Sequence, residues 1–293
     1  MDLHHAIVTA DGSSPSRLML VLHGILGSGG NFRTIARRLA ERHPTWGFVL
    51  VDLRGHGLSQ NPPPPSSVAS AAEDLVRLEA TATIAKNTKN SAPVRGVMGH
   101  SFGGKVALAY AGLRGSQLEQ VWVLDSGPGA HPASVRKGGA EGVLRALEAM
   151  EFPLPSRERF MEILRDQGFS KALIDWLAMN VRRADDGYRL RLDLKVIRAL
   201  IEDYYAQDLW PVIEDRAGGA PEFHVVLGGR SESVPEPDVA RFKDLARAGA
   251  VHLHVLPNAG HWLHADDPEG LLSALAAIEA SDASDASDAK KDS

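Results

Sequence analysis

The segment Gly99-His-Ser-Phe-Gly103 has the residue types and spacing that present a serine hydroxyl for nucleophilic attack. Residues 94–98 are predicted to form a short strand before it, and residues 105–111 are predicted to form a helix after it. The two glycines allow a sharp turn that lifts the Ser101 hydroxyl above the sheet, at a helix N-terminus whose partial positive charge favours a developing anion. We therefore predict that Ser101 is a nucleophile; the alternative is a glycine-rich turn with an incidental serine.

A serine hydroxyl is a poor nucleophile until a base removes its proton, and His261 is the best-placed candidate base. It follows the last predicted strand, residues 251–256, and loops at the carboxyl ends of parallel strands meet over one edge of the sheet. Ser101 and His261 are therefore expected to converge. The chain has 12 histidines, and position after the last strand singles out His261. His264 is near it but lies past the turn, so we rank it below.

A carboxylate is expected to orient the imidazole and to stabilise its charged form. The loop after the penultimate strand is the usual place for it, but Ser231 occupies the position where an aspartate is expected, and a hydroxyl cannot supply the charge. Glu232 is adjacent but points elsewhere if the register holds. Asp125 ends the strand that follows the nucleophile's helix, so its carboxylate starts on the correct edge. We prefer Asp125 over Glu232; a helix-capping or turn role for Asp125 is the remaining alternative.

Acyl transfer also needs fixed hydrogen-bond donors for the oxyanion of its tetrahedral intermediate. One predicted donor is the backbone N–H of Phe102, the residue after the nucleophile. The other is expected in the loop His23-Gly-Ile-Leu-Gly27, after the predicted strand at residues 18–22, and we select the N–H of Ile25. Taken alone, this loop would indicate only simple turn chemistry.

Lys105 and the pair Asp52 and Arg54 are polar residues near these motifs without a predicted catalytic role. Lys105 is one helical turn beyond Ser101 on the same face. It either reaches a loop carbonyl or carboxylate, or it is an ordinary solvated lysine. Asp52 and Arg54 are interpreted as an ion pair that braces a loop.

His252 and His254 alternate within a predicted strand and share one face, which raises the question of a metal site. We find no third ligand nearby, so we predict a surface or packing role for both. The chain also has no Gly-x-Gly-x-x-Gly segment that opens a helix and no phosphate-binding loop. We expect neither a metal nor a cofactor.

The elements that must position these residues alternate between strands and helices in the first half of the chain. Apolar runs that predict buried parallel strands are separated by helical patterns, and the sheet resumes after a long interval. This pattern predicts an α/β fold with a mostly parallel central sheet and helices on both faces. The predicted strands are residues 18–22, 48–51, 94–98, 121–124, 223–227 and 251–256, and a last helix covers 268–280.

The interval at residues 127–219, which we call the cap, has several helical stretches and no strand signals. We predict a helical insertion before the penultimate strand, between core segments 1–126 and 220–280. Its apolar residues Trp176, Met179 and Trp210 either line an acyl pocket or only pack the core of the cap. The tail, residues 281–293, repeats Ser-Asp-Ala and is predicted to be disordered.

Composition excludes several classes of function. The 293 residues are 44% hydrophobic and 24% charged, with a net charge of −5 and no basic stripe of the kind that nucleic-acid binding needs. No cysteine is present, which rules out disulfides and thiolate chemistry. No apolar run approaches the ~18 residues of a membrane span, and the first residues do not resemble a signal peptide. We expect a soluble, cytoplasmic protein and leave its oligomeric state open.

Three motifs resemble the α/β-hydrolase superfamily: His23-Gly-Ile-Leu-Gly-Ser, Asp52-Leu-Arg-Gly-His-Gly-Leu-Ser and Gly99-His-Ser-Phe-Gly-Gly-Lys. Other details are similar to the abhydrolase-domain-containing protein 11 group and related bacterial esterases. These details are Gly-Gly-Lys after the nucleophile, Gly228-Gly-Arg-Ser, Pro257-Asn-Ala-Gly-His-Trp-Leu-His-Ala-Asp and, in the cap, Arg189-Leu-Arg-Leu-Asp-Leu.

The resemblance implies the α/β-hydrolase fold and an esterase or thioesterase that acts on small acyl substrates, without a metal or cofactor. In that group the acid is likewise absent from the usual loop, which agrees with Asp125. The chain departs from the group at Phe102, where methionine is common, and in its proline-rich loop at residues 62–65. Two other functions stay open. One is a C–C bond hydrolase, lyase or cofactor-free peroxidase on the same serine, and the other is a ligand receptor on a hydrolase scaffold.

Overall fold

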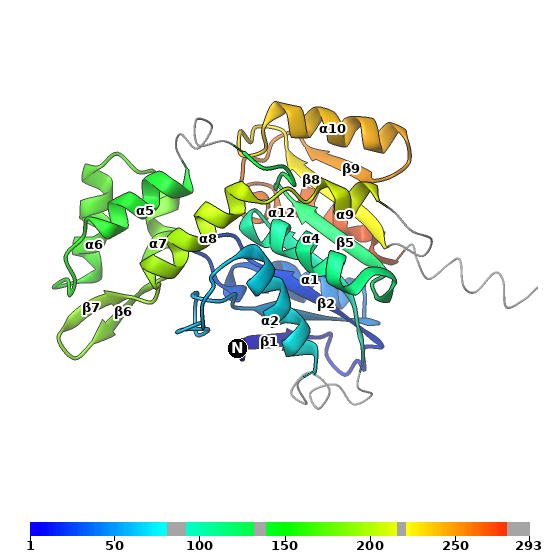
Figure 1. Ribbon diagram of the computed structural model, residues 1–293. Coiled ribbons are helices and arrows are strands. Elements are labelled where there is room, and N and C mark those ends of the chain that lie inside the picture. The colour runs from blue at the N-terminus through cyan, green and yellow to red at the C-terminus, as the bar shows by residue number, and fades with distance from the viewer. Residues whose placement is uncertain (81–91, 132–138, 216–220, 280–293) are drawn as a thin grey trace, which may run out of the picture.

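A seven-stranded sheet with strand order β1-β3-β2-β4-β5-β8-β9 forms the centre of the protein, and each pair of neighbours is parallel except β1 and β3. The computed structural model describes residues 1–80, 92–131, 139–215 and 221–279 (Figure 1). The strands are β1 (His5–Val8), β2 (Arg17–Leu22), β3 (Trp46–Val51), β4 (Val94–His100), β5 (Gln120–Leu124), β8 (Glu222–Gly228) and β9 (His252–Leu256). The predicted mostly parallel sheet is confirmed, with β1 as an additional antiparallel edge strand.

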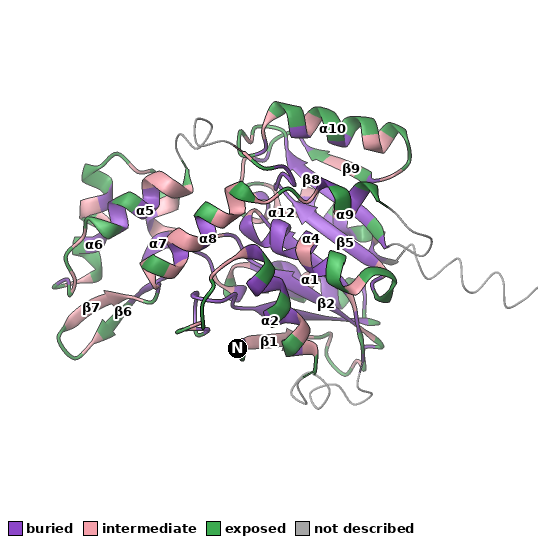
Figure 2. Cartoon of the chain, viewed as in Figure 1, coloured by how far each residue is buried: buried purple, intermediate pink, exposed green. Residues whose placement is uncertain are grey.

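Helices cover both faces of the sheet, as its apolar strands require (Figure 2). Strand β3 is buried along its whole length. One face packs against α2 (Val68–Ala80), α4 (Phe102–Arg114) and α10 (Glu236–Arg247), and the other against α1 (Arg33–Arg42) and α12 (Pro268–Ala274). Short helical segments are Gly29–Phe32, Gly115–Gln117, α11 (Leu263–Asp266) and Leu275–Glu279. The predicted tail at 281–293 lies outside the described residues.

The cap is inserted between β5 and β8, and most of it lies beside the sheet, at the left of Figure 1, whereas its last helix packs against α4. It has its own hydrophobic cluster, which includes Leu144, Phe160 and Leu177. The insertion point agrees with the prediction. Its elements are α5 (Ala140–Glu148), α6 (Arg157–Asp166), α7 (Lys171–Ala178), β6 (Val181–Ala184), β7 (Gly187–Leu190), α8 (Leu194–Ala206) and α9 (Trp210–Glu214).

The expectation that the cap lacks strands is wrong, because β6 and β7 pair as an antiparallel hairpin. Arg182 and Arg183 are exposed on β6, so the strand has no run of alternating apolar residues to reveal it. The signal that was available is the dipeptide Asp186-Gly187 at the turn, where Gly187 has a φ of 137°.

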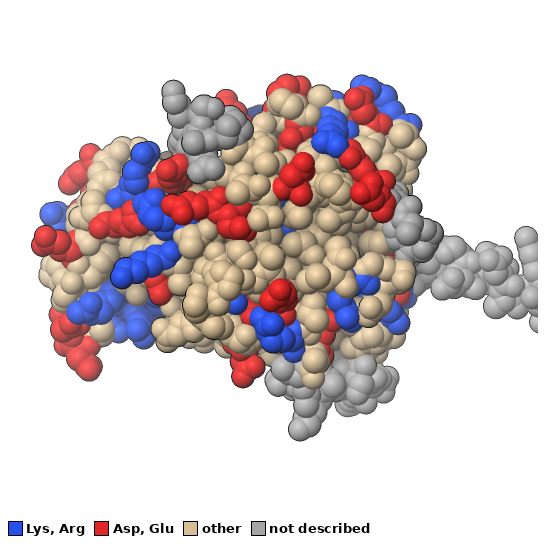
Figure 3. All heavy atoms as spheres, viewed as in Figure 1, with Lys and Arg blue, Asp and Glu red and all other residues tan. Residues whose placement is uncertain are grey.

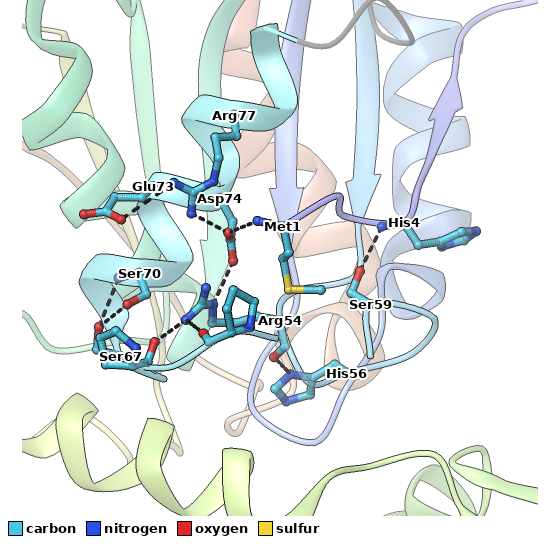
Figure 4. Close-up of polar contacts among 12 residues, drawn as sticks. Met1, His4, Arg54, His56, Ser59, Ser67, Ser70, Glu73, Asp74 and Arg77 are labelled. Atoms are coloured by element: carbon cyan, nitrogen blue, oxygen red, sulfur yellow. Dashed lines mark hydrogen bonds and ion pairs between the residues drawn. The ribbon is translucent and has the colours of Figure 1, made fainter. Parts of the chain in front are cut away.

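Asp52 and Arg54 do not pair with each other, so that prediction is wrong. The Arg54 Nε instead donates to Asp74 on α2 at 2.7 Å, and the second Asp74 oxygen accepts from the Met1 amino group and from Arg77 (Figure 4). Asp52 accepts from two backbone N–H groups of neighbouring loops. Burial alone would raise the pKa of Asp74, but hydrogen bonds from Arg54, the Met1 amino group and Arg77 hold that pKa below its ordinary value.

Acidic and basic side chains are interspersed over the face of the cap that Figure 3 displays. Ion pairs account for some of this mixture, such as Arg198 with Glu148 and Arg189 with Asp186. Within the described ranges, we find no helix with the length and apolar character needed to cross a membrane.

Candidate active site

Ser101 lies in a tight turn between β4 and α4, with φ 53° and ψ −119°. A positive φ is strained for a residue with a side chain, and such strain is concentrated at functional sites. The flanking glycines are required by close packing: a Cβ on Gly99 would lie 1.9 Å from the Gly103 carbonyl oxygen, and one on Gly103 would lie 2.6 Å from that of His23. The Ser101 N–H donates to the carbonyl of Leu124 at 2.9 Å, which ties the turn to β5.

The Asp125 carboxylate lies directly against His261. Its Oδ2 is 2.7 Å from the His261 Nδ1, and Asp125 is 1% exposed. Two more donors hold the carboxylate: the Gly228 N–H at 2.9 Å from Oδ1 and the Ser231 hydroxyl at 2.5 Å from Oδ2. Ser231, at the position where sequence reasoning expected an acid, is therefore a donor to the acid of the neighbouring strand. Sequence reasoning missed this role, although a hydroxyl at that position was the available signal.

Glu232 is exposed and borders a cavity that also contains His261, but no hydrogen bond or ion pair joins these two described residues. The structure thus brings Asp125, and not Glu232, to the imidazole.

Two other histidines, His100 and His264, lie near His261. The His100 Nε2 bonds to the backbone carbonyl of His261 at 2.8 Å, and the two rings lie 4.6 Å apart. His264 packs against Phe32 with ring centroids 4.6 Å apart. Burial lowers the pKa of His264 to about 4 and holds that of His100 well below its ordinary value, so both imidazoles are neutral near pH 7.

Ser101 and His261 both border two adjoining cavities, of about 140 Å³ and about 480 Å³. The smaller cavity is lined mainly by apolar groups, including Leu26, Phe32, Val143, Leu173, Trp176 and Trp262. The larger cavity is more polar, and its lining includes His131, Tyr204, Tyr205, Glu232 and Ser233.

Of the three cap residues considered for an acyl pocket, only Trp176 borders either of these cavities. Met179 is 59% exposed on the cap surface. Trp210 is buried against Phe242, with ring centroids 4.9 Å apart.

The two predicted oxyanion donors lie on the walls of the larger cavity: Ile25 and Phe102 both border it together with Ser101. Phe102 is the first residue of α4, so its N–H has no acceptor within the helix. The next N–H after Ile25, that of Leu26, donates to the His56 Nε2 at 3.0 Å. Burial lowers the pKa of His56 to about 3, so this imidazole is neutral and can accept that bond.

The sequence model described as "Alpha/beta hydrolase family" matches residues 19–274. The chain belongs to the alpha/beta hydrolase family. It is an α/β-hydrolase enzyme, as its motifs indicated.

Two named relatives and one solved structure are similar to this α/β-hydrolase. The sn-1-specific diacylglycerol lipase ABHD11 of Danio rerio is 28% identical, over 90% of this chain and 79% of that protein. Esterase YbfF of Escherichia coli is 27% identical, over 94% of this chain and 98% of its own length. A marine microorganism esterase superposes with a TM-score of 0.72 at 24% identity, covering 93% of this chain and 97% of its own. The sequence relatives confirm the predicted resemblance, and the solved structure confirms the fold.

Lys105 joins α4, the helix that follows Ser101, to the segments that lead into and out of the cap. Its buried Nζ donates to the carbonyls of Gly129, Tyr204 and Gln207 at 2.6–2.9 Å. Of the two alternatives left open for Lys105, contact with carbonyls is therefore right and solvation is wrong. Burial lowers the pKa of Lys105 to about 8, with partial compensation from nearby carboxylates such as Asp238.

Away from the triad candidates, the expectation that His252 has no possible third ligand nearby is wrong. Strand pairing places Glu222 and His224 of β8 beside it, and one ligand atom from each of the three residues lies within 4.8 Å of the others. His254, on the same strand, is a neighbour of His224 as well.

Proposed function

We propose that this α/β-hydrolase cleaves carboxylic ester or thioester bonds of small to medium acyl substrates through an acyl-enzyme on Ser101. The observation that supports this most is the 2.7 Å contact between Asp125 and the His261 Nδ1 at the cavity that Ser101 borders. The names of the two sequence relatives, an esterase and a diacylglycerol lipase, point to the same bond type.

In the proposed reaction, the His261 Nε2 takes the Ser101 proton as the hydroxyl attacks the acyl carbon. Asp125 keeps the proton of the imidazole on Nδ1 and stabilises the imidazolium that forms. The N–H groups of Phe102 and Ile25 stabilise the oxyanion. His261 then returns its proton to the departing alcohol or thiol, and a water repeats the sequence to release the acid.

We infer that the two cavities bind different parts of the substrate. The apolar cavity suits the acyl chain because it offers few hydrogen-bonding partners, whereas the larger polar cavity suits the alcohol or thiol side. Val143 of α5 and Trp176 of α7 come from the cap, so we also propose that residues 127–219 form a lid that sets acyl preference.

A series of p-nitrophenyl esters of increasing acyl length tests this proposal on the wild-type protein and Ser101→Ala. We expect multiple turnover by the wild type and a loss on the order of a millionfold in kcat for the variant. A fluorophosphonate probe should label Ser101 only in the wild type. A single slow turnover would favour the alternative of a ligand receptor on a hydrolase scaffold. Preference for a dienone substrate over every ester would favour the alternative of a C–C bond hydrolase.

A further inference from the structure

Three potential metal ligands gather at the amino ends of β8 and β9, where Glu222 and His252 are the first residues of their strands. Ser101 follows the carboxyl end of the parallel strand β4, so this cluster lies at the opposite edge of the sheet from the candidate active site. His224 pairs in register with His252, and the two side chains therefore project from the same face. The cluster needs an explanation separate from the hydrolase site.

The spacing of the ligand atoms fits a small divalent ion. One ligand atom from each of Glu222, His224 and His252 lies within 4.8 Å of the others, and the His224 Nε2 is 3.5 Å from the Glu222 Oε2. Zinc bound by nitrogen and oxygen at about 2.0–2.1 Å in a tetrahedron separates neighbouring ligand atoms by about 3.3–3.4 Å. The separation between the His224 and Glu222 atoms is thus close to one edge of such a tetrahedron.

The hydrogen bonding of His224 points the same way. His224 is 3% exposed, and its Nε2 has no hydrogen-bond partner among the described residues. Its Nδ1 lies 3.5 Å from the His254 Nε2, and either of these two nitrogens can carry the proton of this weak contact. When the proton is on Nδ1, the Nε2 lone pair faces the Glu222 carboxylate 3.5 Å away, and a cation between the two atoms would relieve this unfavourable contact.

We propose that Glu222, His224 and His252 bind one divalent transition-metal ion of the zinc class, with a water as the fourth ligand. Imidazole and carboxylate together suit Zn²⁺ and its neighbours in the first transition series. His254 supports the site by accepting from the second nitrogen of His224, as partners of metal-bound histidines commonly do. The His252 ring is stacked on His224 at 4.6 Å and 20°, so it must turn to bind; its exposed position permits this. The ion would tie edge strand β9 to β8 and take no part in ester cleavage.

The test is titration of the untagged, metal-free full chain with Zn²⁺ by calorimetry and with Co²⁺ by visible absorption. Trp122 stacks on His224 at 3.9 Å, so Co²⁺ binding should also quench the fluorescence of this tryptophan. Because Glu222 and His252 are exposed, Glu222→Gln and His252→Ala remove ligands without opening the core. His4→Ala is the matched control, since His4 lies 3.1 Å from the Asp52 carboxylate outside this cluster.

We expect one ion per chain, tetrahedral Co²⁺ absorption, and binding weakened about tenfold or more in Glu222→Gln and His252→Ala but not in His4→Ala. Thermal unfolding of the wild type should shift upward with Zn²⁺, and that of His252→Ala should not. Absence of saturable binding, or equal binding by wild type and His252→Ala, would overturn the proposal. The metal-free and the Zn²⁺-loaded protein should hydrolyse esters at the same rate. The result of the metal titration is therefore independent of the result of the Ser101 experiment.

Discussion

The carboxylate that contacts His261 comes from Asp125, at the end of β5, and not from the loop after β8. Strands β5 and β8 are parallel neighbours, so their carboxyl ends reach the same edge of the sheet. A carboxylate from either strand can therefore reach an imidazole above that edge. Here Asp125 of the β5 end makes the contact, and Ser231 after β8 supplies a hydroxyl that holds it.

We predict that Asp125→Asn lowers kcat by about 10⁴-fold, which is the cost of the equivalent change in a serine protease triad. The amide keeps the shape but removes the charge that stabilises the imidazolium. Ester hydrolysis measured at saturating substrate checks this. Glu232→Gln is the control, because Glu232 is exposed and no hydrogen bond or ion pair joins it to His261 within the described chain. A large loss in Glu232→Gln with little loss in Asp125→Asn would move the acid to the loop after β8.

The cap reaches the apolar cavity through α5 and α7, which contribute Val143 and Trp176 to its lining. We predict that Trp176→Ala enlarges this cavity and shifts the preference toward longer acyl chains. The ratio of kcat/KM for an octanoyl over a butanoyl ester should increase about tenfold, since a single methylene in such a pocket is worth about 1–3 kcal/mol.

Met179→Ala provides the matched control for Trp176, because Met179 follows the same helix but is 59% exposed and borders neither cavity. An unchanged chain-length preference in Trp176→Ala, or an equal change in Met179→Ala, would contradict the proposal that the cap sets acyl-chain preference.

Lys105 connects several elements, because its three hydrogen bonds join α4 to α8 and to the segment after β5. We predict that Lys105→Met lowers the free energy of unfolding by about 1–3 kcal/mol, since carbonyls lose their donor. Burial lowers the pKa of Lys105 from 10.5 to about 8 in the folded protein. Between these values unfolding takes up a proton, so the contribution of Lys105 to stability increases as the pH rises.

Urea unfolding of the wild type and Lys105→Met at about pH 7 and about pH 9.5 measures this effect. The difference in free energy of unfolding should be larger at the higher pH. Lys195→Met, at an exposed lysine of α8, should show no such pH dependence. A difference that shrinks between the two pH values would contradict the buried, pKa-shifted state of Lys105.

The elements that could be predicted from the sequence are those with strong local patterns. Strands buried on both faces are continuous apolar runs, and the rule that their carboxyl ends meet is enough to predict that Asp125 and His261 converge. The hairpin β6–β7 was missed because Arg182 and Arg183 are exposed on β6 and leave it without an alternating apolar pattern. The proximity of Glu222 to His252 was missed for a different reason: it depends on which strands are neighbours in the sheet, and no local pattern encodes that order.

At the scale of the whole molecule, the buried pair of Arg54 and Asp74 connects the loop after β3 to helix α2. Arg54 is 2% exposed and Asp74 is fully buried, so neither charge is hydrated. Breaking a buried pair by removing one partner leaves the other charge uncompensated, which is far more costly than loss of a surface pair. The fold therefore relies on Asp74 more than on any of the exposed ion pairs of the cap.

We predict that Asp74→Asn lowers the free energy of unfolding by about 3–5 kcal/mol near pH 7. The neighbouring Glu73→Gln is the matched control: Glu73 pairs with Arg77 at 3.8 Å, but both side chains are at least half exposed, so a change of at most about 1 kcal/mol is expected.

The hydrogen bonds that hold the pKa of Asp74 below its ordinary value of 3.8 stabilise the folded state above that value. This contribution is lost as the pH falls through the lowered pKa, so the wild type and Asp74→Asn should approach equal stability in acid. Urea unfolding from about pH 7 to about pH 3 tests both points, and a constant difference across that range would show that the charge of Asp74 is not what stabilises the fold.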